Sequence, residues 1–204
     1  MKKQIVFIHG GEAFSSYDTY IENLKNEQVD PFAKKEKRWH QLLGEVLGSE
    51  YEVFTPTMPN SKNAKYQEWK IWFEKYVPFL QDGVILIGHS QGGYFLSKYL
   101  VENKFPVAIE ALYLVGAVFN AEGLVEEDGG DFAFDTEKLG NVALQVAHIF
   151  ICHSEDDFVI PFPHAEKYLE KLPQATLLRF TDRNHFLQQE FPELVDSIQH
   201  LSSV

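Results

Sequence analysis

The amino-acid sequence predicts an α/β fold of three layers, in which helices cover both faces of a mostly parallel sheet of about six strands. Two observations lead to this fold class. Short apolar runs alternate regularly with longer stretches of helical pattern along the chain. The apolar runs are continuous rather than alternately polar, which is typical of strands that are buried on both faces, as in a parallel sheet.

Strands are expected where runs rich in Val, Ile, Leu or Phe end in a turn signal: residues 4–9, 51–55, 83–88, 109–116, 147–153 and 176–180. Helices are expected over residues 36–48, 63–80, 92–104, 137–146, 162–171 and 188–202. Two stretches, near residues 10–35 and 117–136, show neither pattern and are expected to be irregular insertions. Because the 204 residues contain no repeat or low-complexity linker, we expect residues 1–204 to form a single domain.

Composition narrows the classes of partner and the compartment. The chain has 18 Lys and Arg against 30 Asp and Glu, and its net charge of -12 argues against nucleic acid or an anionic membrane surface as partner. A single cysteine, Cys152, excludes an internal disulfide and suits a reducing compartment. The apolar run after Met1 is too short for a signal peptide, and no stretch is predicted to span a membrane. We therefore expect a cytoplasmic protein.

The strongest local signal is the sequence Gly88-His89-Ser90-Gln91-Gly92, which follows an apolar run and precedes a helical pattern. Gly-x-Ser-x-Gly between a strand and a helix is the layout of a nucleophile elbow, a sharp turn that exposes one serine. Gly88 and Gly92 lack the Cβ atoms that would collide in such a turn. We expect Ser90 to be a catalytic nucleophile, and the alternative is an ordinary turn serine.

Polar residues that suit a nucleophilic serine follow other predicted strands. A serine hydroxyl needs a histidine to take its proton and a carboxylate to hold that imidazole in the useful tautomer. Asp157 and His185 follow the last two strands, and the order Ser90, Asp157, His185 is a known order for such a triad. Asp156 is the alternative acid, because either of the two adjacent carboxylates is able to cap the following turn.

An oxyanion hole would complete the site. One expected donor is the backbone N–H of Gln91, which immediately follows the serine. The other is expected from Gly11, in the loop after the first strand, where glycine lets the backbone approach a substrate closely.

These segments resemble the α/β-hydrolase superfamily and, within it, the small serine hydrolases related to YdeN and retinoblastoma-binding protein nine. The resemblance rests on residues 5–10, 56–60 with Trp69, 88–92, 157–161 and 184–186. It implies the strand order 2-1-3-4-5-6, a serine nucleophile, Asp157 as the triad acid, and no metal or organic cofactor. The segment 12–40 is bulkier than in the smallest members, and the retinoblastoma-binding signature Leu-x-Cys-x-Glu is absent.

Other residue groups have simpler interpretations. Eight histidines raise the question of a metal, but no His-Glu-x-x-His or Cys-x-x-Cys spacing occurs, so we expect no metal site. We expect His89 to support the elbow rather than to act in catalysis. The tryptophans are expected in the core or in pocket walls: Trp39, Trp69 and Trp72.

Two charged stretches also call for an interpretation. Residues 120–137 contain seven carboxylates and no Lys or Arg. They form either a solvated loop or a cap over the site, with Phe119, Phe132 and Phe134 as an apolar wall. The basic run of residues 34–38 is expected to be the exposed start of a helix.

The expected function is a serine hydrolase that cleaves an ester, thioester or amide of a small-molecule acyl substrate through an acyl-enzyme. A carboxylesterase is the first expectation, and a small-substrate peptidase or an acyltransferase uses the same groups. The alternative is a protein-binding or regulatory module on the same fold, because a fold does not define a function. The acyl group, the leaving group and the oligomeric state stay open at this stage.

Overall fold

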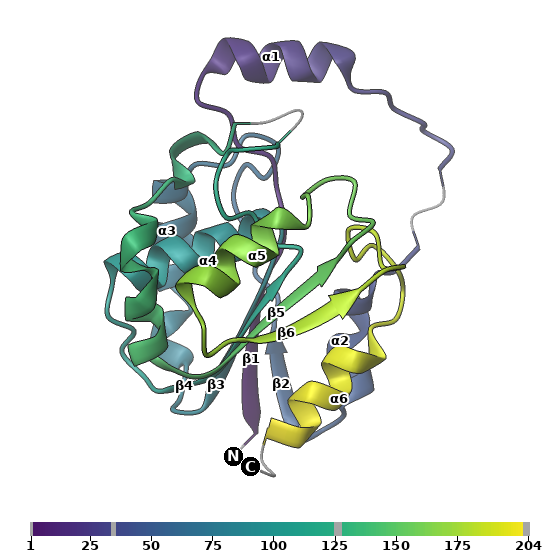
Figure 1. Ribbon diagram of the computed structural model, residues 1–204. Helices are drawn as coiled ribbons and strands as arrows, with labels where there is room; N and C mark the ends of the chain where they lie inside the picture. Colours follow the sequence, from purple (N-terminus) through teal and green to yellow (C-terminus); the bar gives the residue numbers. More distant parts are fainter. Residues whose placement is uncertain (1, 34–35, 125–127, 202–204) are drawn as a thin grey trace.

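The computed structural model describes residues 2–33, 36–124 and 128–201, and six parallel strands within them form one sheet in the order β2-β1-β3-β4-β5-β6 (Figure 1). The strands are β1 (Lys3–Ile8), β2 (Tyr51–Phe54), β3 (Val84–His89), β4 (Ile109–Val115), β5 (Val146–Ser154) and β6 (Thr176–Phe180). The expected fold class and strand order are confirmed. All residues of β3 are buried, as the continuous apolar runs predicted.

Helices cover both faces of the sheet (Figure 1). One face carries α3 (Tyr66–Glu74), α4 (Gln91–Glu102), α5 (Pro163–Lys171) and the 3₁₀ helices η1 (Val77–Phe79), η2 (Gly130–Phe132) and η3 (Thr136–Leu144). The other face carries α2 (Trp39–Leu47) and α6 (Pro192–His200). A hydrophobic core lies on each face of the sheet. Because side chains along a strand point to opposite faces, Val6 and Ile8 of β1 pack in one core and Ile5 and Phe7 pack in the other.

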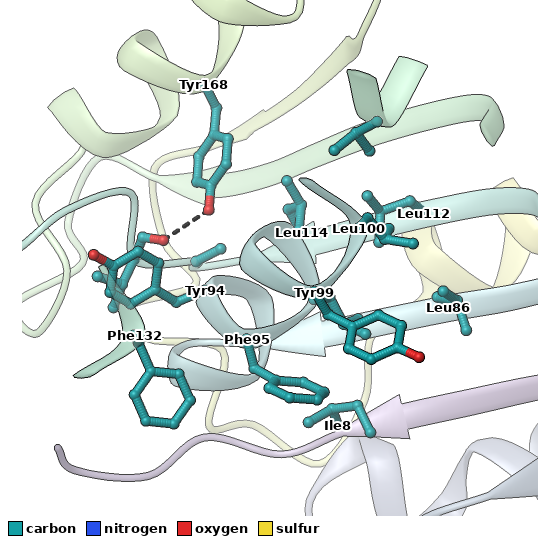
Figure 2. Close-up of a cluster of buried hydrophobic side chains, with 14 of the residues drawn as sticks. Ile8, Leu86, Tyr94, Phe95, Tyr99, Leu100, Leu112, Leu114, Phe132 and Tyr168 are labelled. Atoms are coloured by element: carbon teal, nitrogen blue, oxygen red, sulfur yellow. Dashed lines mark hydrogen bonds between the residues drawn. The ribbon is translucent and has the colours of Figure 1, made fainter. Parts of the chain in front are cut away.

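The larger core is built around α4 and is rich in aromatic rings (Figure 2). Phe73 makes edge contacts with Phe95 and with Tyr99, with ring centroids 5.4 Å and 5.0 Å apart. Tyr168 of α5 reaches the same core and donates a hydrogen bond of 2.7 Å to the carbonyl of Val118. This packing holds α4, and with it the turn before it, firmly against the sheet.

The stretch of residues 10–35 is not irregular throughout, because residues Tyr17–Asn26 form the helix α1. The sequence does carry a helical signal here, because the apolar residues Tyr17, Tyr20, Ile21 and Leu24 recur at helical spacing, although none of them is buried. A second local signal is the cap, since Ser16 accepts a hydrogen bond of 3.1 Å from the N–H of Thr19.

Three further expectations are corrected. The helix predicted over residues 36–48 begins at Trp39, so Lys37 and Arg38 precede it rather than start it, while residues 34–35 lie outside the described part. The helix predicted over 63–80 divides into α3 and η1, and that over 137–146 is the 3₁₀ helix η3. Trp39 and Trp69 are buried, and Trp72, which is 37% exposed, lines a surface pocket with Phe54 and Tyr76, so the expected core and pocket-wall positions are confirmed. In the described ranges no helix has the length and apolar character needed to cross a membrane.

Candidate active site

Ser90 lies between β3 and α4 in a strained turn. Its φ of 55° and ψ of -123° are unusual for a residue with a side chain, and such strain is concentrated at functional sites. The turn packs directly on β1, since a Cβ at Gly92 would lie 2.2 Å from the carbonyl oxygen of Ile8. The N–H of Ser90 donates a hydrogen bond of 2.9 Å to Val115, which fastens the turn to β4. Ser90 is therefore held at the carboxyl edge of the sheet.

Asp157 and His185 face one another at the ends of β5 and β6. The Nδ1 of His185 lies 2.8 Å from Oδ2 and 3.1 Å from Oδ1 of Asp157. The Asp157 Oδ1 also accepts the N–H groups of Val159 and Ile160, each at 2.9 Å, which fixes the direction of the carboxylate. An ionised carboxylate can only accept hydrogen bonds, so the Nδ1 of His185 must carry the ring hydrogen. The Nε2 of His185 is then the basic nitrogen.

Asp156 has a different set of partners, although it is the next residue. Its Oδ1 accepts hydrogen bonds from the hydroxyl of Ser154 and, at 3.0 Å, from the N–H of Asn184. The hydrogen bond from Ser154 lowers the pKa of the Asp156 carboxyl. Asp156 therefore attaches the loop that carries His185 to the end of β5 and does not contact the imidazole ring.

Two buried histidines support this pair from behind. The Nε2 of His89 donates a hydrogen bond of 2.9 Å to the carbonyl of His185, and that of His153 donates one of 2.9 Å to Ile160. Burial lowers the pKa of both rings, that of His89 well below its usual value. As neutral donors, they fix the backbone on either side of the Asp–His pair. His89 thus holds the His185 loop, whereas the sequence suggested support of the elbow itself.

The loop after β1 is also held by a histidine. The N–H of Met58 donates to Nε2 of His9 at 2.8 Å, so the ring hydrogen is on Nδ1, which donates to the Gly10 carbonyl at 2.6 Å. Both nitrogens of His9 are therefore used structurally. Among the described residues, no group of three His, Cys, Asp or Glu side chains is arranged to hold a metal ion.

Two backbone donors near Ser90 are unpaired. The N–H of Glu12 donates to Ser61 at 2.8 Å, but those of Gly11 and Gln91 have no acceptor within the described part of the chain. A Cβ at Gly11 would lie 2.7 Å from the carbonyl oxygen of Ser61, so this close packing of the loop requires glycine. An unpaired N–H at a helix start and another in a glycine loop are the groups that an oxyanion hole uses.

Ser90, His185 and Gly11 all line one cleft with a volume of about 650 Å³. The lining residues are His9, Gly10, Gly11, Glu12, Arg38, His40, His89, Ser90, Leu124, Phe158, Val159, His185 and Leu187. No motif marks His40, Leu124 or Leu187 as functional, and Arg38 was interpreted only as part of the basic run of residues 34–38. These residues reach the cleft only through the fold.

The segment after β4 contributes to the cleft in a different way from the one proposed. Leu124 lines the cleft, but Phe119 and Phe132 are buried in the core, and Phe134 packs beside Tyr94. These phenylalanines therefore form no apolar wall of the cleft, and residues 125–127 lie outside the described part.

His164 of α5 fastens the start of this segment. Its Nδ1 accepts the N–H of Phe119 at 3.0 Å, and its Nε2 donates to the carbonyl of Glu122 at 2.9 Å. Both ring nitrogens thus hold the backbone just before Leu124.

The comparisons with known proteins agree with this architecture. No protein-family model matches the chain. The serine hydrolase RBBP9 of Rattus norvegicus is 25% identical over 151 residues, which cover 74% of this chain and 78% of the relative. The putative hydrolase YdeN of Bacillus subtilis is 21% identical over 192 residues, covering 93% and 89%.

Solved structures show the same fold. The crystal structure of the ydeN gene product from B. subtilis matches with a TM-score of 0.72 and 19% identity, covering 100% of both chains. The esterase RhEst1 from Rhodococcus matches with a TM-score of 0.59 and 15% identity, covering 99% of this chain and 91% of the esterase.

The parallel sheet, its strand order and the serine turn after β3 define a protein of the α/β-hydrolase fold. Within that fold, the chain is distantly similar to the serine hydrolase RBBP9 and to the putative hydrolase YdeN.

Proposed function

We propose that this protein is a serine hydrolase that cleaves a small to moderate ester, thioester or amide through a Ser90–His185–Asp157 triad. The observation that carries the proposal is the Asp157–His185 contact of 2.8 Å, which leaves Nε2 basic in a cleft that Ser90 also lines. The strained backbone of Ser90 is further support, since such strain is retained where a side chain must be exposed for reaction.

The chemical steps follow from these groups. Ser90 Oγ bonds to the acyl carbon while its proton passes to His185 Nε2, and the N–H groups of Gly11 and Gln91 stabilise the oxyanion. His185 then returns the proton to the leaving group as the old acyl bond breaks. Water attacks the acyl-enzyme by the same route and releases the acid and Ser90. Every group in this scheme is a side chain or amide of the chain, so it calls for no cofactor.

Fluorophosphonate labelling tests the proposal. We expect the folded protein to be labelled once, at Ser90, and the Ser90→Ala variant to resist labelling while retaining its circular dichroism spectrum. Ester hydrolysis by Ser90→Ala should fall by about 10⁶-fold in kcat, the loss seen when a triad nucleophile is removed.

The same experiment distinguishes a binding module from an enzyme. Heat-unfolded protein serves as the control for nonspecific labelling of serine. If the folded protein is labelled no faster than the unfolded protein and hydrolyses no activated ester, the triad is not functional and the alternative of a binding module holds.

A further inference from the structure

Arg38 stands apart from the other arginines of the chain. The sequence contains three arginines, and two of them are paired: Arg179 Nε lies 2.5 Å from Glu155, and Arg183 contacts Glu193. In contrast, no carboxylate of the described residues lies within 4.0 Å of the Arg38 guanidinium, and its side chain makes no hydrogen bond there. Arg38 nevertheless lines the cleft that contains Ser90 and His185.

Among the described residues that line the cleft, the carboxylate that could oppose the charge of Arg38 has other partners. Glu12 is the acidic residue of the lining, but its carboxylate lies 3.4 Å from Lys62 Nζ and accepts from Asn23 at 3.1 Å. The imidazoles of His40 and His89 add no positive charge at neutral pH. Burial, with a smaller contribution from the charge of Arg38, lowers the pKa of His40 to about 4 and that of His89 well below its usual value.

The rest of the wall suits a hydrocarbon chain. Leu124, Phe158, Val159 and Leu187 contribute apolar side chains, and Phe158 is 68% exposed although it is large and aromatic. Covering a surface of this kind with an apolar segment of a ligand lowers the free energy of the complex.

We propose that the cleft selects substrates that carry an anionic group, above all a carboxylate, which binds Arg38 while the apolar wall contacts the chain leading to the scissile carbonyl. The inference rests on the proposed hydrolase function and names its substrate class. Guanidinium is the group that matches a carboxylate with two parallel hydrogen bonds. A local cation is needed for this selection, because a protein of net charge -12 otherwise repels anions.

Matched ester pairs test the proposal. One series carries the carboxylate on the acyl side: p-nitrophenyl hemiesters of malonic, succinic, glutaric and adipic acids against neutral p-nitrophenyl esters of equal length. A second series carries it on the leaving group: 4-acyloxybenzoates against the phenyl esters. We expect one anionic series to exceed its neutral counterpart in kcat/KM, and the series that does so identifies the side on which the anion binds.

Arg38→Gln should remove this preference. We expect kcat/KM for the preferred anionic ester to fall at least tenfold, while that for its neutral counterpart changes less than twofold. Lys37→Gln is the matched control, because it removes the same charge from the adjacent residue, which pairs with Glu45 and does not line the cleft. The control should leave both esters unchanged. An equal loss for neutral and anionic esters in Arg38→Gln, or no anionic preference in the wild type, would overturn the proposal.

A binding measurement separates this inference from the proposed function. Calorimetric titration of glutarate into Ser90→Ala should show binding that is lost in the Ser90→Ala/Arg38→Gln double variant. Binding that depends on Arg38 without hydrolysis of any ester refutes the hydrolase and leaves the anion site standing. Hydrolysis without binding or anionic preference refutes the anion site alone.

Discussion

At the scale of single residues, the adjacent aspartates show how local backbone geometry assigns different roles to identical side chains. Asp157 accepts two backbone N–H groups and faces His185, whereas Asp156 accepts from Ser154 and Asn184. The first arrangement orients an imidazole, and the second attaches the loop that bears it.

Amide variants of the two aspartates should therefore differ strongly. Asp157→Asn keeps the shape of the side chain but favours the wrong tautomer of His185, which in a serine protease costs about 10⁴ in kcat. We expect a loss of that order. Asp156→Asn retains an oxygen that accepts the same hydrogen bonds, so its activity should fall by no more than about tenfold.

Both variants are measured with one activated ester under identical conditions, after circular dichroism has shown each to be folded. A severe loss in Asp156→Asn with a mild loss in Asp157→Asn would contradict the assignment and reassign the triad acid.

At the scale of secondary structure, α1 and α4 represent opposite ways of stabilising a helix. The ten residues of α1 include no buried one, and Figure 1 shows the helix at the edge of the molecule, away from the sheet. Polar contacts connect α1 and the residues just before it to neighbouring loops. Asn23 donates a hydrogen bond to Glu12, and Ser15 donates one to Asp128. The twelve residues of α4 include nine buried ones, so packing rather than local preference stabilises it.

Hydrogen exchange should reflect this difference. Because isolated helices shorter than about 12 residues are marginal in water, the amides of α1 should exchange through local opening. Those of the central turns of α4 should require global unfolding. We expect exchange in α1 to be faster by a factor of at least about 10³, as measured by peptide-resolved mass spectrometry. Comparable protection of the two helices would contradict this and would indicate that another surface covers α1.

At the scale of the whole molecule, the fold depends on histidines that are kept neutral. The pKa values of His40, His89, His153 and His164 are all lowered, with burial as the largest cause. Each donates to, or lies beside, backbone that shapes the cleft, so protonation of these rings acts against the folded state as a whole.

The pH dependence of stability follows from the sign of these shifts. For His164 the pKa falls from 6.5 in the unfolded chain to about 4 in the fold. Between these values only the unfolded chain binds the proton. The stabilisation is therefore complete above about pH 6.5 and is lost as the pH falls towards 4, with a slope of up to about 1.4 kcal/mol per pH unit.

Urea unfolding at pH 7.5, 6 and 5 measures this slope in the wild type and in His164→Gln. The variant should be less stable at pH 7.5, because glutamine does not reproduce both contacts with Phe119 and Glu122. Its free energy of unfolding should also depend less steeply on pH. Equal slopes in the two proteins would show that His164 takes up its proton in the folded state as readily as in the unfolded chain.

The sequence alone determined the strands and the serine turn. Buried strands leave continuous apolar runs, and the turn at Ser90 requires glycine at Gly92 because the chain passes so close to Ile8. Both features depend on residues that are close together in the sequence, so local patterns are enough to predict them. The order 2-1-3-4-5-6 came from resemblance and is confirmed by the pairing of the strands.

Only the tertiary structure decided what the motifs could not encode. Phe132 is in the core rather than in a cap because Trp69 and Tyr66 lie beside it. The cleft wall joins Arg38 with Leu124 and Leu187, residues far apart in the chain. The physical reason is one of range: backbone strain and apolar period act over a few residues, whereas the direction of a side chain and the composition of a cleft depend on which distant segments pack together.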